Sequence, residues 1–132
     1  MPQTRIQQLF ERTRKEGRAA LIAYLTAGDP SPDKTPEIAA TLVRAGVDLI
    51  ELGVPFSDPV ADGVVNQEAA QRALKHKVTL HDVVDLVRKL REQTRIPIVL
   101  FTYFNPVLAY GLKAFAEEAS EAGVDGVLCV DL

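Results

Sequence analysis

The stretch AGVDLIELGVPFSDPVADG, residues 45–63, contains one strand of a parallel sheet and the loop that follows it. Residues 47–54 form a continuous apolar run, which is typical of a strand covered on both faces. Glu51 interrupts this run, and Asp58 and Asp62 follow in the loop. A carboxylate inside such a strand is costly to bury unless it is paired, hydrated or neutralised. Glu51 is therefore the first candidate functional residue.

The rest of the chain has the composition of an ordinary soluble domain. It has 132 residues, of which 47% are hydrophobic and 25% charged, with a net charge of −3. This length fits a single α/β domain over residues 1–132. The charges are interspersed, so we expect neither a nucleic-acid partner nor a membrane partner. No apolar run reaches the ~18 residues of a membrane span, no secretory signal is present, and Cys129 is the single cysteine, so we expect a cytoplasmic protein.

Apolar runs and helical patterns alternate along the chain. The apolar runs predict four strands: 19–27, 47–54, 96–104 and 124–131. Helical patterns precede and separate them: a leading amphipathic helix, Thr35 to near Gly46, Thr79 onward, and Asn105 to near Gly123 with an interruption at Gly111. At Thr79 the stretch TLHD fits an N-cap signature, with Asp82 three residues on. Strands that alternate with helices predict a parallel sheet with right-handed crossovers. The joint AGVD occurs twice, at 45–48 and 122–125, each time between a helix end and a strand.

Glu51 and Asp62 are more informative together than alone. The carboxyl ends of parallel strands form the mouth in which such folds bind ligands, and both acids belong to that end of one strand and its loop. Two carboxylates in one pocket can serve as a general acid and a general base. The structural alternatives are a Glu51 paired with an arginine or a backbone amide, and an Asp62 that forms an Asx turn. No spaced set of Cys, His and acidic residues suggests a metal site.

Four segments resemble a known family: LTAGDP (25–30), GVDLIELGVPFSDPVADG (46–63), TYFNPVLAYG (102–111) and AGVDGVLCVDL (122–132). In order and spacing they are similar to the first half of the tryptophan synthase alpha subunit. The resemblance implies a four-stranded (βα)4 half of a TIM barrel with a leading helix. It also implies the family's activity, the retro-aldol cleavage of indole-3-glycerol phosphate to indole and glyceraldehyde 3-phosphate without a cofactor.

The roles of individual residues follow from the same resemblance. Glu51 matches the acid–base group at indole C3 and the glycerol hydroxyl. Asp62 matches the aspartate that holds the indole N–H and stabilises the developing cation. By position, four residues resemble the wall of the indole pocket: Tyr24, Phe101, Tyr103 and Leu128. Three others belong to loops that meet the beta subunit in the family: Pro55, Asp58 and Asn105.

The chain also departs from the family pattern. A complete barrel has eight strands, and its phosphate grip is built by the loops after strands seven and eight, whereas this sequence predicts four strands. Ala23, Val64 and Asn66 replace residues that are usual in the family. We interpret the chain as an excised or engineered half-barrel scaffold without activity of its own; the alternative is an active lyase that retains the acid pair. The sheet can keep its barrel curvature or flatten into an open, Rossmann-like doubly wound sheet.

Half a barrel has two open sheet edges and an open inner face. The first and fourth strands are apolar and carry no charge that would discourage pairing. Curved strands would also expose an inner face that includes Phe101, Leu128 and Val130. Two copies can close against each other as a homodimer. Alternatively, the leading helix or the segment 64–76 covers the inner face. We expect the dimer.

Overall fold

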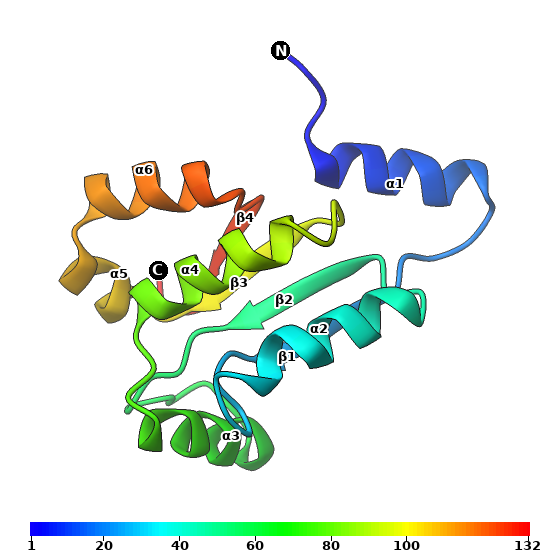
Figure 1. Cartoon of the computed structure of the whole chain (residues 1–132). Coiled ribbons are helices and arrows are strands. Elements are labelled where there is room, and N and C mark those ends of the chain that lie inside the picture. The colour runs from blue at the N-terminus through cyan, green and yellow to red at the C-terminus, as the bar shows by residue number, and fades with distance from the viewer.

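The computed structural model describes residues 1–132 in full. The elements in chain order are α1 (Arg5–Lys15), β1 (Ile22–Thr26), α2 (Lys34–Arg44), β2 (Leu49–Gly53), α3 (Val64–Lys75), α4 (Leu80–Arg91), β3 (Ile98–Thr102), α5 (Phe104–Tyr110), α6 (Leu112–Ala122) and β4 (Gly126–Cys129) (Figure 1). No helix among them is long and apolar enough to cross a membrane.

The four strands form one parallel sheet in the order β1-β2-β3-β4. This consecutive order is that of a barrel, in which each strand pairs with the next along the chain. A doubly wound sheet reverses its strand order at a switch point, so the Rossmann-like alternative is wrong. The predicted half of a TIM barrel is confirmed.

The predicted elements are present with different bounds. Each strand is shorter than its apolar run, because residues at both ends of the run belong to the connecting loops. The interruption at Gly111 is confirmed: this glycine has a φ of +99°, and it separates α5 from α6. Thr79 caps α4 as predicted, since its hydroxyl accepts the Asp82 N–H at 3.3 Å. Helix α3 was not among the predicted helices, because its small and polar residues give a weak helical pattern.

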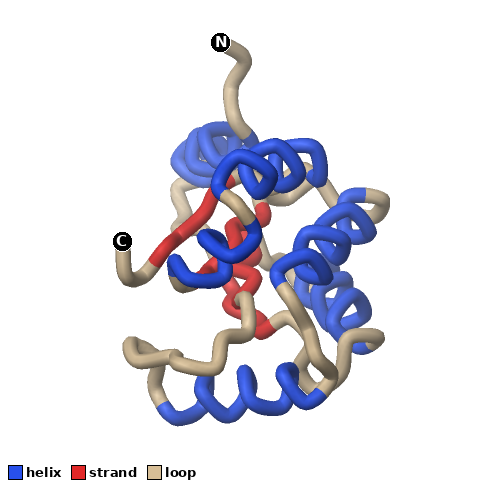
Figure 2. The backbone as a smooth tube through the Cα atoms, turned by 90° about the vertical axis from the view of Figure 1, so that its left-hand side faces the viewer, coloured by secondary structure: helices blue, strands red, loops and turns tan.

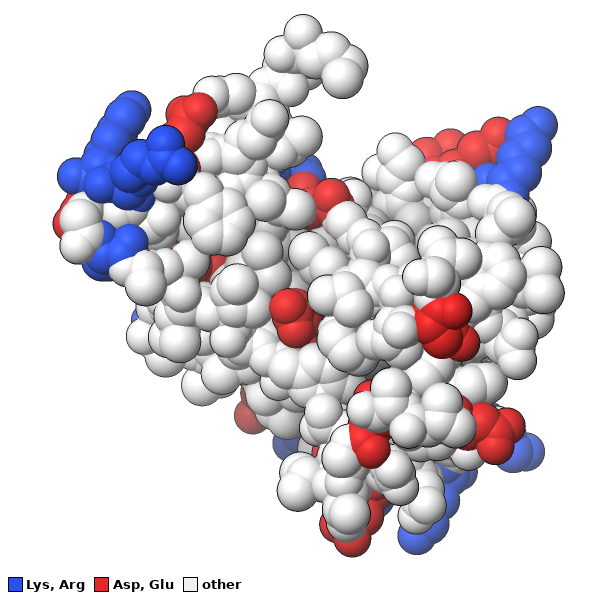
Figure 3. Space-filling view, turned by 180° about the vertical axis from the view of Figure 1, so that it is seen from behind, with Lys and Arg blue, Asp and Glu red and all other residues white.

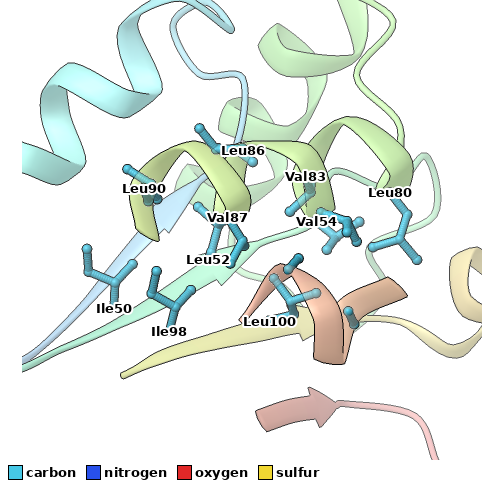
Figure 4. Close-up of a cluster of buried hydrophobic side chains, with 14 of the residues drawn as sticks. Ile50, Leu52, Val54, Leu80, Val83, Leu86, Val87, Leu90, Ile98 and Leu100 are labelled. Atoms are coloured by element: carbon cyan, nitrogen blue, oxygen red, sulfur yellow. The ribbon is translucent and has the colours of Figure 1, made fainter. Parts of the chain in front are cut away.

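The hydrophobic core lies between the sheet and the three helices α2, α4 and α6 (Figure 4). Alternate residues of the central strands point to this face: Ile50, Leu52, Ile98 and Leu100, each fully buried. Helix α4 packs on them with one continuous apolar stripe: Val83, Val84, Val87 and Leu90. Burying a side chain of this size stabilises the fold by about 1.5–3 kcal/mol, so each contact between these two layers contributes to the stability.

The other face of the sheet is the inner face of the half-barrel. Because side chains alternate along a strand, Glu51 points away from the core that Ile50 and Leu52 enter. In Figure 2 helices lie above, to the right of and below the strands. The view from behind shows a mostly uncharged surface with isolated acidic residues and with Lys and Arg at its periphery (Figure 3). Leu128 remains 39% exposed on this face.

Neither of the two predicted covers lies over the centre of the inner face. Helix α1 lies at the N-terminal ends of the strands, where Ile6 reaches the position of Gly126. Helix α3 contacts β1 and buries three alanines near Gly28 and Val78. Of the two segments named in that alternative, α1 thus reaches the inner face at its N-terminal edge, and α3 packs beside β1.

Asp48 joins three parts of the chain at the N-terminal end of β2. Its carboxylate accepts the backbone N–H of Leu21 at 2.8 Å, so it closes the unit β1-α2-β2. Arg18 donates both terminal nitrogens to the same carboxylate, at 2.8 and 3.0 Å. Arg12 of α1 adds a third contact at 3.1 Å. The hydrogen bond from the Arg18 guanidinium is the main reason that the pKa of Asp48 lies well below its usual range, and the hydrogen bond from the Leu21 amide is the second.

Asp125 repeats this arrangement before β4. Its carboxylate accepts the N–H of Ile98, the first residue of β3, at 2.8 Å. Arg91 of α4 and Arg5 of α1 donate to the same group, Arg5 at 2.8 Å. The repeated AGVD joint thus has a structural meaning: each aspartate closes one β-α-β unit and binds one arginine of α1.

Candidate active site

Glu51 lies on the inner face in the middle of β2, half-buried, with Tyr24 and Val99 beside it in the register of the sheet. Its carboxylate has no hydrogen bond or ion pair with any side chain or backbone group of the chain. The structural alternative, a glutamate satisfied by an arginine or a backbone amide, is therefore not found. The carboxylate is free to meet a ligand on the inner face.

Tyr24 lies beside Glu51 in the register of the sheet. Burial is the main reason that the pKa of the Tyr24 phenol is raised, and the negative charges of Asp62 and Glu51 raise it further. That Glu51 and Asp62 share one pocket stays a prediction. The Tyr24 ring meets Phe101 edge to face, with the ring centroids 5.5 Å apart. Thr26 lies beside it, its hydroxyl 3.4 Å from that of Tyr24.

Tyr103 differs from the other aromatic residues of the predicted pocket wall. It is only 3% exposed, and its ring packs against Phe56 with centroids 5.3 Å apart. Its hydroxyl accepts the backbone N–H of Ala61 at 2.9 Å. Burial chiefly, and then the nearby charge of Asp62, raises the pKa of the Tyr103 phenol. The residue is oriented toward the loop that carries Asp62.

The remaining predicted residues have different degrees of exposure. Leu128 lies beside Phe101 in the register and is partly open to solvent. Of the residues assigned to partner loops, Asp58 and Asn105 are exposed and Pro55 is buried. No group of three or more His, Cys, Asp and Glu side chains is close enough to hold a metal ion.

Two of the three departures from the family pattern lie at the start of α3. Val64 is 69% exposed, and Asn66 is half-buried in the same helical turn. Asn66 does not make a buried face polar, because the buried side of α3 consists of alanines. Nothing in the structure explains either residue as an adaptation of an isolated half-barrel.

Sequence reasoning missed the part that Gly53 has in this site. The Tyr24 ring lies against Gly53, where any side chain would collide with it. A glycine inside a strand indicates a bulge or a close approach by another group, and this signal was available in the motif ELGV. Phe56 and Ala61 were also missed, because their contacts with Tyr103 join segments that are distant in the sequence.

A consecutive parallel sheet, with acidic and aromatic side chains on its inner face, defines half of a (β/α)8 barrel. Comparison with known proteins gives the particular family. The family model described as tryptophan synthase alpha chain matches residues 10–132. The chain belongs to the tryptophan synthase alpha chain family and corresponds to its N-terminal half.

Individual relatives agree with this assignment. The tryptophan synthase alpha chain of Solibacter usitatus is 57% identical over 128 residues, covering 97% of this chain and 48% of the relative. That of Opitutus terrae is 54% identical over 129 residues, covering 98% and 48%. The crystal structure of tryptophan synthase subunit alpha from Legionella pneumophila superposes with a TM-score of 0.97 at 42% identity, covering 99% of this chain and 50% of that one. The chain spans about half the length of the relatives it matches.

Proposed function

We propose that this chain carries the acid–base half of a site that cleaves indole-3-glycerol phosphate to indole and glyceraldehyde 3-phosphate. The observation that supports this most directly is the unpartnered carboxylate of Glu51 on the inner face, beside Tyr24 in the register of the sheet. In this proposal Glu51 is the acid–base group and Asp62 holds the indole N–H. Tyr24, Phe101 and Leu128 form part of the wall around the indole ring.

The proposed reaction explains why two carboxylates are needed. Protonation of indole C3 interrupts the aromatic ring system and leaves a positive charge centred on the ring nitrogen. Asp62 stabilises that charge by accepting the N–H hydrogen bond. Glu51 supplies the proton to C3 and takes one from the glycerol hydroxyl as the carbon–carbon bond breaks. The hydroxyl carbon becomes the aldehyde of glyceraldehyde 3-phosphate, and the electron pair of the broken bond restores the indole ring.

The 132 residues on their own are proposed to be inactive. Phosphate binding in such barrels depends on loops after strands seven and eight, and the chain contains strands one to four. Binding energy from a remote phosphate contributes to catalysis as well as to affinity. A steady-state assay of the chain is therefore expected to give no appreciable turnover. A rate that disappears in Glu51→Gln would overturn this expectation, because a contaminating enzyme would not respond to the substitution.

A completed barrel tests the acid pair itself. The chain would be joined to the second half of the Solibacter usitatus relative, and turnover of indole-3-glycerol phosphate would be measured. Glu51→Gln and Asp62→Asn are expected to lower kcat by about 10²-fold or more each. Asp58→Asn, a change of the same kind at an exposed loop position, is the matched control and should leave kcat unchanged. Equal rates for all three variants would refute the proposed roles.

Two kinds of partner fit the exposed surfaces of the chain. We propose that a second copy closes on the open inner face and on the free edges of β1 and β4, where Ile22, Val127 and Leu128 are exposed. We also propose a beta-subunit contact through Asp58 and Asn105, both exposed at the carboxyl end of the sheet. The proposed setting for this biosynthetic role is the cytoplasm.

A further inference from the structure

The loop that carries Asp62 has few contacts of its own. Its internal hydrogen bonds form a tight turn: Val60 N–H donates to Asp58 O at 2.8 Å, and Asp62 N–H donates to Pro59 O at 3.0 Å. Much of the turn is exposed, and Val60 is 85% exposed. A segment with little buried surface opens locally at low free-energy cost, so the turn alone does not fix where the Asp62 side chain lies.

One hydrogen bond joins residues 56–63 to the carboxyl end of the sheet. It runs from the N–H of Ala61 to the hydroxyl of Tyr103, over 2.9 Å. On the other side of Asp62, Gln67 of α3 donates to the Asp62 carbonyl at 2.8 Å. Asp62 therefore lies between two anchor points. The hydrogen bond from Ala61 to Tyr103 is the one that fixes the loop relative to β3.

Tyr103 is held firmly enough to serve as a reference point. It follows β3 directly and is 3% exposed. Thr102, before it, is fully buried and donates its hydroxyl to the Tyr103 carbonyl at 2.9 Å. The Phe56 ring packs on the Tyr103 ring from the loop side, with the two planes at 34°. A ring enclosed in this way has no alternative rotamer available without disturbing its neighbours.

The Tyr103 hydroxyl has a second use. Its oxygen accepts from Ala61, so its own proton is available for another group. Asp62 directly follows Ala61, whose N–H meets this hydroxyl, so the Asp62 side chain is a candidate acceptor for that proton. Burial chiefly, and then the negative charge of Asp62, raises the pKa of the phenol. The hydroxyl therefore stays protonated at neutral pH and presents its O–H to the acidic side of the loop.

We propose that Tyr103 is a positioning residue for Asp62, holding the loop through the Ala61 amide and orienting the carboxylate through its hydroxyl. This differs from the role that the family resemblance implies, a wall of the indole pocket. The inference rests on the proposed function of Asp62 as the group that holds the indole N–H. The inference adds that the position of the Asp62 carboxylate depends on the Tyr103 hydroxyl group.

The test uses NMR on the 132-residue chain and needs no turnover. In Tyr103→Phe the ring remains and the hydroxyl is lost, so hydrogen exchange of the Ala61 amide is expected to become about three- to tenfold faster, the equivalent of one hydrogen bond. The side-chain ¹³Cγ resonance of Asp62 is expected to shift. Tyr110→Phe is the matched control: it removes a phenolic hydroxyl that donates to Glu118 and should leave both signals unchanged.

The outcomes separate this inference from its alternatives. The amide of Val130, which donates to Thr102 O at 3.0 Å next to the site, should exchange at its original rate. An unchanged Ala61 amide overturns the positioning role, and so does faster exchange throughout the sheet, which would make Tyr103 a general core residue. If Ala61 responds as expected but Asp62→Asn leaves the completed barrel fully active, the proposed function of Asp62 has failed and the anchoring of the loop has not.

Discussion

The phenol ring of Tyr24 lies so close to Gly53 on the neighbouring strand that a methyl group on Gly53 would stand 2.2 Å from the Tyr24 hydroxyl. Tyr24 pairs in the register with Glu51, two residues before Gly53. The ring therefore leans toward the carboxyl end of the sheet and carries its hydroxyl toward the mouth. Gly53 allows this orientation because it has no side chain.

Gly53→Ala should displace the Tyr24 ring and lower the free energy of unfolding by about 1–2 kcal/mol, as overpacking usually does. Urea unfolding measures the change in the free energy of unfolding. The displacement of the ring is measured by how far the Asp62 charge alters the ultraviolet titration of the Tyr24 phenol. Gly126→Ala is the control, since it adds a methyl group on the same inner face at an ordinary 3.6 Å from Val99. Equal losses in both variants would show that the contact with Tyr24 is unimportant.

Asp48→Asn tests the junction at the N-terminal end of β2. We expect a loss of about 2 kcal/mol at neutral pH, less than for a fully buried pair, because both arginine partners are about half exposed. The pKa of Asp48 is lowered in the folded state, mainly by Arg18. Its contribution is therefore present above the unfolded value of about 4 and is lost as the pH falls below it.

Urea midpoints measured between pH 7 and pH 2 distinguish the contribution of the Asp48 charge from a change in local packing caused by the substitution. The difference between wild type and Asp48→Asn should shrink as the solution becomes acidic. Asp58→Asn, at an exposed residue without an ion pair, should follow the wild-type curve. A constant difference at every pH would mean that the carboxylate charge is not what Asp48 contributes.

Thr79→Ala removes the cap of α4, the helix that covers the centre of the sheet. Thr79 and Asp82 satisfy each other's backbone N–H groups, at 3.3 and 2.8 Å. Loss of the hydroxyl should cost about 1 kcal/mol in the free energy of unfolding. Thr41→Ala provides the comparison, since that exposed hydroxyl bonds back to Glu37 O within α2. A larger effect at Thr41 would contradict the capping explanation.

The open inner face predicts self-association. Size exclusion coupled to light scattering at low micromolar concentration should give the mass of two chains. Leu128→Lys places a charge on the partly exposed inner face and should shift the peak toward one chain, whereas Leu112→Lys, on the surface of α6, should not. A sharp single-chain peak for the wild type that also fails to bind a hydrophobic dye would exclude the dimer.

Local patterns predicted what depends on local chemistry. The consecutive apolar runs predicted four parallel strands, and the capping signal at Thr79 and the break at Gly111 predicted helix ends correctly. Glu51 was found because a charge in an apolar strand conflicts with burial. The choice between a barrel-like and a doubly wound sheet depended on strand order, which the family resemblance implied and periodicity alone did not.

Other features depend on contacts between distant segments and left no local signal. Helix α3 was missed because small and polar residues give it no strong apolar stripe. The bond between Ala61 and Tyr103 spans 42 positions, and neither residue is unusual in its own sequence context. Likewise, the two AGVD joints were visible as a repeat, but the arginines that meet them come from α1.

Those two joints have a consequence for how the chain responds to cutting. Each aspartate closes one β-α-β unit. Helix α1 contacts both units, because Arg12 pairs with Asp48 and Arg5 pairs with Asp125. Helix α1 thus links the two β-α-β units, here called modules. The other contacts between them are the pairing of β2 with β3 and the packing of α2, α4 and α6. Without residues 1–17, each module would still be closed by its own aspartate, but the two modules could unfold separately. A single cooperative unfolding transition would then divide into two.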